Sequence, residues 1–222
     1  MITFALRQRV VLIATVLAAA LLPSASVSAS AASAPTHATQ AAHATQAAHA
    51  AHAAPANSCP RVDDHLFAAA DQRADLSRIT PTPSWRTNCK QLYRADGRPP
   101  SIVFAEGFHP KATVDGQYDI EQYVLVNQPS PYVSTTYDHD LYKTWWKSGW
   151  NYYIDAPGGV DVNKTIGDTH KWASQVEVAF PGGIERSFIV GVCPVDKTTK
   201  TEIMNECQDN PYYQPWRENY PG

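Results

Sequence analysis

The chain has 222 residues, of which 18 are basic and 21 acidic, so its formal net charge at neutral pH is −3. This length is enough for one domain with a sizeable core. The charge balance excludes a protein that is drawn to nucleic acid by a basic field over its whole surface. Any contact with DNA would have to come from a local patch.

The N-terminal residues 1–29 have the pattern of a secretory signal peptide. Arg7 and Arg9 precede an uncharged apolar run over residues 10–22, and small residues follow up to Ala29, a plausible cleavage site. The run is short for a membrane span, and no second apolar stretch is long enough to cross a bilayer. We therefore expect a secreted, extracellular protein that does not associate with a membrane.

Residues 30–56 form a low-complexity spacer rich in alanine and histidine, without the aromatic and branched side chains that build a core. Its closely spaced histidines could bind a metal weakly, but no carboxylate or fixed geometry supports a site. We expect the spacer to be disordered and to hold no metal. A single folded domain is expected over residues 57–222.

Four cysteines fall within the expected domain, and none shows the C-x-x-C spacing of a zinc site or a redox dithiol. In the oxidising compartment that a signal peptide implies, two disulfides are the default. Three pairings are possible. The sequential one is favoured because each bridge would then tie down one terminal segment of the domain: Cys59 with Cys89, and Cys193 with Cys207.

Periodicity, turn residues and capping residues predict a series of short helices and strands in the domain. In chain order these are a helix over 63–73, a strand over 91–94, a turn of helix over 101–108, a helix over 119–126, a strand over 132–137, a helix between Asp138 and Gly149, and strands over 150–155, 174–180 and 187–192. After Cys193 mostly turns are expected, with Tyr212, Tyr213 and Trp216 packed back on the domain. Many short strands interrupted by helices indicate an α+β domain rather than parallel βαβ units.

The predicted helix after Asp138 contains two adjacent tryptophans, Trp145 and Trp146, which cannot both face inward. One of them is therefore expected to be exposed, with Lys147 close by. The simpler explanation is an amphipathic surface helix. The functional explanation is an aromatic platform for stacking, with a cation beside it.

In the strand expected before the Pro-Gly-Gly turn, apolar residues recur at every second position, which is typical of a strand with one buried face. Val176, Val178 and Phe180 would face the core, and Gln175 and Glu177 would lie side by side on the opposite face. On its own this pattern fits an ordinary edge strand with a solvated polar face. The alternative is a rigid support that presents an amide next to a carboxylate.

Three short motifs follow one another along the chain: Leu92-Tyr93-Arg94, then Ser134-Thr135-Thr136 within a strand, then Gln175-Val176-Glu177. This ordered set resembles the mono-ADP-ribosyltransferase toxins. The flanking residues, among them Arg98-Pro99-Pro100 and Phe180-Pro181-Gly182-Gly183, are similar to the scabin-like (pierisin-like) members, which are secreted and act on DNA. The resemblance covers most of the chain from Asn57 to Trp216.

The resemblance implies an ADP-ribosyltransferase fold, an α+β core of mixed, mainly antiparallel strands in two packed sheets flanked by short helices. It implies NAD+ as the substrate and no metal. Arg94, Ser134, Thr135, Thr136 and Glu177 would bind NAD+, and Glu177, Gln175, Ser134 and Arg94 would be the catalytic residues. Cleavage of the nicotinamide–ribose bond develops positive charge on the ribose, which a fixed carboxylate stabilises. A planar guanidinium suits the diphosphate.

In this family the residue two positions before the catalytic glutamate reads the acceptor. Gln175 in that place implies either guanine in DNA, nucleosides or nucleotides, or asparagine in a protein, because an amide both donates and accepts hydrogen bonds. Aromatic rings with cations beside them suit an exposed base and its phosphate. The resemblance places such groups, and one further amide, at Trp172, Lys171, Trp145, Lys147 and Asn127.

We expect a monomeric enzyme that transfers ADP-ribose from NAD+ to guanine. Within the same class, the alternatives are a C3-like transferase acting on a protein asparagine and an NAD glycohydrolase. A different class is a non-catalytic, disulfide-stapled extracellular binding module whose tryptophans stack on sugars. Nicotinamide release from NAD+ distinguishes an enzyme from a binding module.

Overall fold

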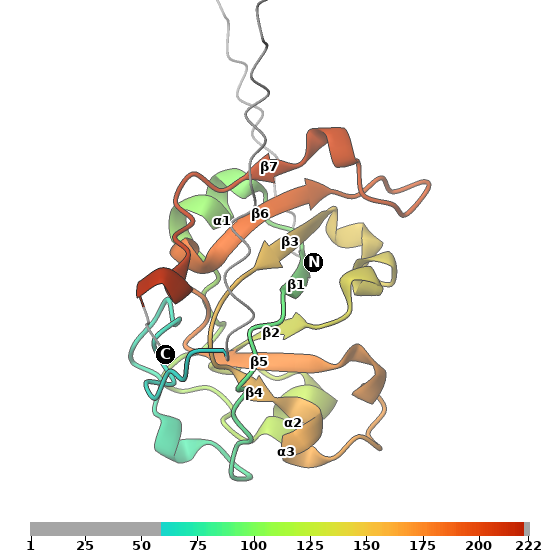
Figure 1. The fold of residues 1–222 in the computed structure, drawn as a ribbon. Coiled ribbons are helices and arrows are strands. Elements are labelled where there is room, and N and C mark those ends of the chain that lie inside the picture. Colours follow the sequence, from blue (N-terminus) through green and yellow to red (C-terminus); the bar gives the residue numbers. More distant parts are fainter. Residues whose placement is uncertain (1–58, 220–222) are drawn as a thin grey trace, which may run out of the picture. The chain divides into compact units, whose positions relative to one another are not determined.

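A seven-stranded sheet runs through residues 59–219, the part of the chain that the computed structural model describes (Figure 1). Neighbouring strands are antiparallel and lie in the order β4-β5-β2-β1-β3-β6-β7. The strands are β1 (Leu92–Asp96), β2 (Tyr132–Thr136), β3 (Trp150–Ile154), β4 (Val160–Asp161), β5 (Glu177–Pro181), β6 (Ile189–Pro194) and β7 (Gln208–Asp209). The predicted signal peptide and spacer lie outside the described residues.

Short helices flank this sheet. The α-helices are α1 (Pro100–Glu106), α2 (Ile120–Val126) and α3 (Val162–Ile166). The 3-10 helices are η1 (Leu76–Arg78), η2 (His139–Lys143), η3 (Trp146–Ser148), η4 (Ala173–Gln175), η5 (Arg186–Phe188), η6 (Met204–Glu206) and η7 (Trp216–Asn219). Within residues 59–219, no helix has the length and apolar character that crossing a membrane requires.

The strands fall into two groups that meet at one residue pair (Figure 1). β1 and β2 are paired at Tyr93 and Thr136, whereas all five residues of β1 pair with β3 and all five residues of β2 pair with β5. The α+β class and the antiparallel core are confirmed. The expectation of two separate packed sheets needs correction, because β1 pairs with both of its neighbours and so joins the two groups into one sheet.

Both faces of β2 and β5 are covered. Val133 and Val178 belong to one hydrophobic cluster, whereas their chain neighbours Tyr132 and Ala179 belong to a second cluster that includes residues of α2 and α3. Successive strand residues point to opposite faces, so neither face of these two strands is open to solvent. The simpler expectation for the strand before Pro181, an edge strand with a solvated polar face, is therefore wrong.

That strand also begins later than its alternating pattern indicated. β5 starts at Glu177, because η4 precedes it and Val176 has a left-handed backbone with a φ of 41°. The Val176 amide donates to the Ala173 carbonyl at 3.1 Å. The expectation that Gln175 and Glu177 share one strand face is thus wrong, since they lie on either side of a sharp turn.

Most of the other predicted elements are confirmed within two residues at each end, namely β1, α1, α2, β2, β3 and β6. α2 illustrates why. The Asp119 side chain accepts a hydrogen bond from the Gln122 amide at 2.8 Å at the start of the helix, and Asn127 ends it in the left-handed conformation. Both residue types are readable in the sequence as caps.

Two further predicted elements differ from the structure. Residues 63–73 form turns rather than a helix, and the chain there bonds to the turn after β5, with the Asp71 amide donating to the Gly182 carbonyl at 2.8 Å. The helix after Asp138 is divided into η2 and η3.

The C-terminal tail packs on the domain through Asp155. The Asp155 carboxylate accepts hydrogen bonds from the Tyr213 hydroxyl at 2.7 Å and from the Arg217 guanidinium at 2.8 Å, and Trp216 is buried. The expected packing of these two aromatic residues is confirmed. Tyr212 is 47% exposed, and the Arg186 guanidinium lies 4.3 Å from the centre of its ring, so Tyr212 packs on the domain through one face only.

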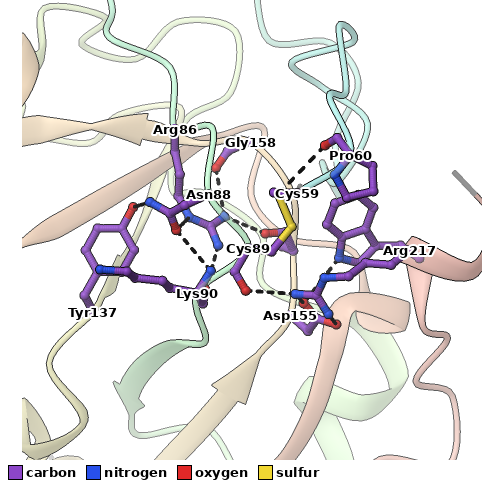
Figure 2. Close-up of a disulfide and its surroundings, with 12 residues drawn as sticks. Cys59, Pro60, Arg86, Asn88, Cys89, Lys90, Tyr137, Asp155, Gly158 and Arg217 are labelled. Carbon is purple, nitrogen blue, oxygen red and sulfur yellow. Dashed lines mark hydrogen bonds and ion pairs between the residues drawn. A yellow bond between two sulfur atoms is a disulfide. The ribbon is translucent and has the colours of Figure 1, made fainter. Parts of the chain in front are cut away.

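Both disulfides of the sequential pairing are present, Cys59–Cys89 and Cys193–Cys207. Figure 2 shows the first of them beside the tail, where Arg217 donates to the Cys89 carbonyl at 2.9 Å while also binding Asp155. The beginning and the end of the described domain are therefore held at one place. The bridge contributes about 3 kcal/mol on a loop-entropy argument.

Candidate active site

Glu177 stands at the start of β5, between β4 and β2, and only 9% of its surface is exposed. Its carboxylate accepts a hydrogen bond from the Tyr123 hydroxyl of α2 at 2.9 Å. Burial raises the pKa of Glu177, and the hydroxyls of Ser134 and Tyr123 together with the charge of Arg94 oppose that rise. A buried carboxylate held by two hydroxyls and a nearby cation is prepared to act on a developing positive charge.

The turn before Glu177 is held from several sides. The Thr136 hydroxyl donates to the Gln175 carbonyl at 2.6 Å, and the Asn163 amide donates to the Ala173 carbonyl at 2.9 Å. Val176, a β-branched residue, is thereby kept in a left-handed conformation that costs on the order of 1–3 kcal/mol. Strain of this kind persists only where the surroundings impose it, and here it directs Gln175 and Glu177 into the same cleft.

The three hydroxyl residues of β2 play different parts. Thr135 and Thr136 are buried, and their hydroxyls donate to the carbonyls of Val178 and Gln175, so they brace the cleft wall. Ser134 is half-buried and borders all three hollows described below. Direct binding of NAD+ by the two threonines remains a prediction, and their bonded hydroxyls favour a supporting role.

Arg94 is held in place by β1, the strand that carries it, and by the neighbouring strand β2. Its guanidinium donates to the Ser134 carbonyl at 2.6 Å and to the Asp96 carboxylate at 2.9 Å. Asp96 also accepts from the Arg98 guanidinium at 2.8 Å. Burial alone would raise the pKa of Asp96, but the hydrogen bonds from Arg98 and the charges of both arginines outweigh it and hold that pKa well below its usual range.

Three adjoining hollows share Ser134 and together make one cleft. The first, of about 370 Å³, is lined by Arg94, Arg98, His109 and Lys111 among others, and is its cationic end. The second, of about 220 Å³, is lined by Tyr123, Val124, Asn127, Ser134, Trp145, Trp172, Gln175 and Glu177. The third, of about 200 Å³, lies along Thr135 and Thr136 and reaches Trp145 and Gln175. Larger hollows elsewhere are lined by none of the predicted site residues.

The structure brings most of the predicted acceptor surface to the middle of this cleft. Trp145 and Trp172 are 47% and 39% exposed, and they border the same hollow as Asn127, Gln175 and Glu177. The two predicted lysines lie beside the hollow rather than in it. The Lys171 ammonium lies 5.2 Å from the centre of the Trp172 ring, and that of Lys147 lies 5.5 Å from the centre of the Trp146 ring.

Sequence reasoning missed Tyr123, Asp96, Arg98, His109 and Lys111. Tyr123 has no local signal, because a tyrosine in an amphipathic helix looks like a core residue. Asp96 did have a local sequence signal. Residues two apart on a strand share a face, and Arg94 and Asp96 form such a pair. Within the described part of the chain, no group of three or more His, Cys, Asp or Glu side chains is arranged to hold a metal ion.

Comparison with known proteins shows the family. The family model described as Scabin-like matches residues 92–213, a span that contains all three motifs. A guanine-specific ADP-ribosyl transferase of Streptomyces coelicolor is 71% identical over 161 residues, covering 72% of this chain and 79% of that protein. Pierisin of Pieris brassicae is 40% identical over 112 residues, which are 45% of this chain and only 13% of pierisin.

A solved structure gives the same result. Scabin toxin from Streptomyces scabies in complex with NADH superposes with a TM-score of 0.72 at 72% sequence identity, over 73% of this chain and 99% of that one. The family match spans more than half of this chain and includes Arg94, Ser134 and Glu177. The chain therefore belongs to the Scabin-like family.

Proposed function

We propose that this chain is a secreted mono-ADP-ribosyltransferase that moves ADP-ribose from NAD+ to guanine in DNA, nucleosides or nucleotides. The observation that carries the proposal is the buried Glu177 carboxylate, which shares one hollow with Gln175 and two exposed tryptophans. Similarity to a guanine-specific ADP-ribosyl transferase and to scabin with NADH supports the reaction and the substrate. Two disulfides fit the oxidising environment that export provides.

The cationic end of the cleft suits the diphosphate of NAD+. Arg94 and Arg98 are oriented there by Asp96, and Lys111 adds a third positive charge. A guanidinium can hold phosphate oxygens through two parallel hydrogen bonds. With the diphosphate held there, the nicotinamide-bearing ribose extends toward Ser134 and Glu177 in the adjoining hollow.

Glu177 acts when the bond between nicotinamide and ribose breaks. The electron pair of that bond leaves with nicotinamide, and the positive charge that develops on the ribose is stabilised by the carboxylate. The exocyclic amine of guanine then attacks the anomeric carbon, and the proton that it loses passes to solvent water. Gln175 is suited to orient the guanine edge, because its amide donates one hydrogen bond and accepts another.

The two exposed tryptophans suit a base that is out of a duplex stack. Trp145 and Trp172 line the hollow that holds Gln175 and Glu177, and a flat aromatic face binds a base by stacking. Chemistry on the guanine amine requires an accessible base, which a strand end, a single strand or a flipped nucleotide provides.

Gln175→Ala is expected to separate the two halves of the reaction. Transfer to guanine should fall by about 100-fold, because the acceptor is no longer oriented, whereas NAD+ hydrolysis should change by less than threefold because Glu177 and Arg94 remain. Mass spectrometry of guanine- and adenine-containing oligonucleotides incubated with NAD+ measures the first, and nicotinamide release measures the second. Nicotinamide release by the wild-type protein without an adduct on any oligonucleotide would contradict the guanine acceptor and assign it to a protein or water.

Tyr123→Phe tests how Glu177 is kept ionised. The Tyr123 hydroxyl stays protonated and so remains a hydrogen-bond donor, because burial and the charge of Glu177 raise the pKa of Tyr123 well above the ordinary value. Its loss removes a hydrogen bond to a charged group, so the pKa of Glu177 should rise further. The acidic limb of the rate profile for nicotinamide release should then move to higher pH. An unmoved limb in folded protein would exclude Tyr123 from this role, and Tyr93→Phe serves as a control within the same cleft.

A further inference from the structure

A cluster of lysines lies just outside the cleft described above. One of them, Lys147, is among the acceptor residues that the family resemblance implies, and the other two lie on a segment that the proposed reaction does not use. We call Lys147, Lys197 and Lys200 the lysine patch. The ammonium groups of Lys147 and Lys200 lie 5.5 and 5.4 Å from the centre of the same Trp146 ring, although the two lysines are more than fifty positions apart in the chain. The stem of Lys197 lies over Gly149, where a Cβ atom would come within 3.8 Å of the lysine Cε. All three side chains are exposed.

The patch has a rigid support. The connection between β6 and β7 carries Lys197 and Lys200, and its Val195 amide donates to the Gly149 carbonyl at 2.9 Å (Figure 1). Further along the same connection, the buried Glu202 carboxylate accepts from the Asn151 amide at 2.8 Å and from the Tyr153 hydroxyl at 2.9 Å, both on β3. Because the backbone is held at both places, little backbone conformational entropy is lost when the lysines bind a ligand.

The positive charge of the patch is not cancelled locally. Within residues 59–219, no carboxylate lies within ion-pair distance of the three ammonium groups. Asp196, the acidic residue next to Lys197 in the sequence, instead accepts hydrogen bonds from the backbone amides of Thr198 and Thr199 at 2.7 and 2.8 Å. Three uncompensated cations therefore stand together on a chain whose net charge is −3.

The patch is continuous with the cleft. Trp145 and Ser148 border the same hollow as Gln175, and Lys147 lies between these two residues in the chain, within η3. A single strand that leaves the cleft past Trp145 would meet the lysine patch next. A nucleoside bound in the cleft is too short to reach the lysine patch. The patch thus distinguishes a polymeric acceptor from a monomeric one.

We propose that the lysine patch binds backbone phosphates of single-stranded DNA flanking the guanine that is modified. This inference deepens the proposed function and rests on it for the position of that guanine. The ligand chemistry is a polyanion with regularly spaced phosphates, which matches several exposed ammonium groups on a fixed surface. The indole of Trp146 adds a face for a flanking base.

The test compares Lys197→Ala/Lys200→Ala with Arg61→Ala/Lys90→Ala, a control that removes the same charge from exposed positions outside the cleft. Binding of a fluorescent single-stranded oligonucleotide that contains one guanine is measured by anisotropy without NAD+, at several salt concentrations. For the patch variant, affinity at low salt should fall by about tenfold. Its slope of log affinity against log salt should become shallower by about 1.4, because each phosphate contact on a single strand contributes about 0.7. The control should match the wild type.

Kinetics with NAD+ provide the second readout. The KM for the oligonucleotide should rise in the patch variant, while the KM for guanosine and the rate of nicotinamide release stay at wild-type values. Unchanged oligonucleotide affinity and salt slope would overturn the inference. So would unchanged DNA binding with lost binding to heparin or to vesicles of anionic lipid, which would assign the patch to another polyanion. Lysine-dependent DNA binding without any guanine adduct would support phosphate binding by the patch while overturning the proposed function and, with it, the position of the modified guanine.

Discussion

Glu177→Gln is expected to reduce both ADP-ribose transfer and NAD+ hydrolysis by about 1,000-fold or more. The substitution keeps the shape of the side chain and a carbonyl oxygen that can still accept from Tyr123 and Ser134. It removes the negative charge that stabilises the developing cation on the ribose, and electrostatic groups of this kind typically contribute factors of 100 to 1,000 or more. Nicotinamide release and the adduct mass on a guanine oligonucleotide measure the two activities.

The same variant should not be less stable than the wild type at neutral pH. Burial raises the pKa of Glu177, so the ionised form opposes folding. This unfavourable contribution is absent below the ordinary glutamate pKa of about 4 and develops as the pH rises through the raised value. Thermal unfolding of Glu177→Gln should therefore occur at an equal or higher temperature at pH 7, and at the wild-type temperature near pH 4. Loss of activity together with a lower melting temperature would indicate a structural rather than a catalytic role.

Asp96→Asn is expected to weaken NAD+ binding and to destabilise the fold together. Asp96 is 7% exposed and is the shared anion of Arg94 and Arg98, so its loss leaves two guanidinium groups side by side without the carboxylate that pairs with both. Breaking a buried pair by removing one partner costs about 3–5 kcal/mol. We expect about 2 kcal/mol here, because the Arg98 side chain is 36% exposed and solvent screens it. The KM for NAD+ should rise by about tenfold, because both arginines lose their fixed orientation.

The pH dependence of that destabilisation has a definite sign. The pKa of Asp96 is held below its ordinary value in the folded state, so its stabilising contribution is fully present above about pH 4. It is lost as the pH falls through the lowered folded-state value. Chemical denaturation at pH 7 and at pH 3 measures the difference, which should shrink at the lower pH. Asp63→Asn is the matched control, because its pair with Arg61 is more than 80% exposed and should contribute less than about 1 kcal/mol. Equal effects of the two substitutions would contradict the role assigned to Asp96.

Local features of the chain accounted for much of the fold. Asp119 and Asn127 are of cap-forming types, so the limits of α2 follow from the sequence. Two adjacent tryptophans on one short segment cannot both be buried, and Trp145 is indeed the exposed one. By contrast, an acidic pair at residues 63 and 64 did not make a helix, because contacts with the turn after β5 outweighed a weak local preference.

The sequence by itself determined the order of the three motifs, the family they resemble and the residue types the chemistry needs: an arginine, a serine, an amide and a carboxylate. Only the tertiary structure decided that Glu177 is buried, that Val176 turns the chain before it, and that Tyr123 and Asp96 belong to the site. The physical reason is the distance along the sequence over which each kind of interaction acts. Caps, turns and periodicity act between residues a few positions apart, whereas the pKa of a carboxylate depends on side chains brought to it from strands and helices distant in the sequence.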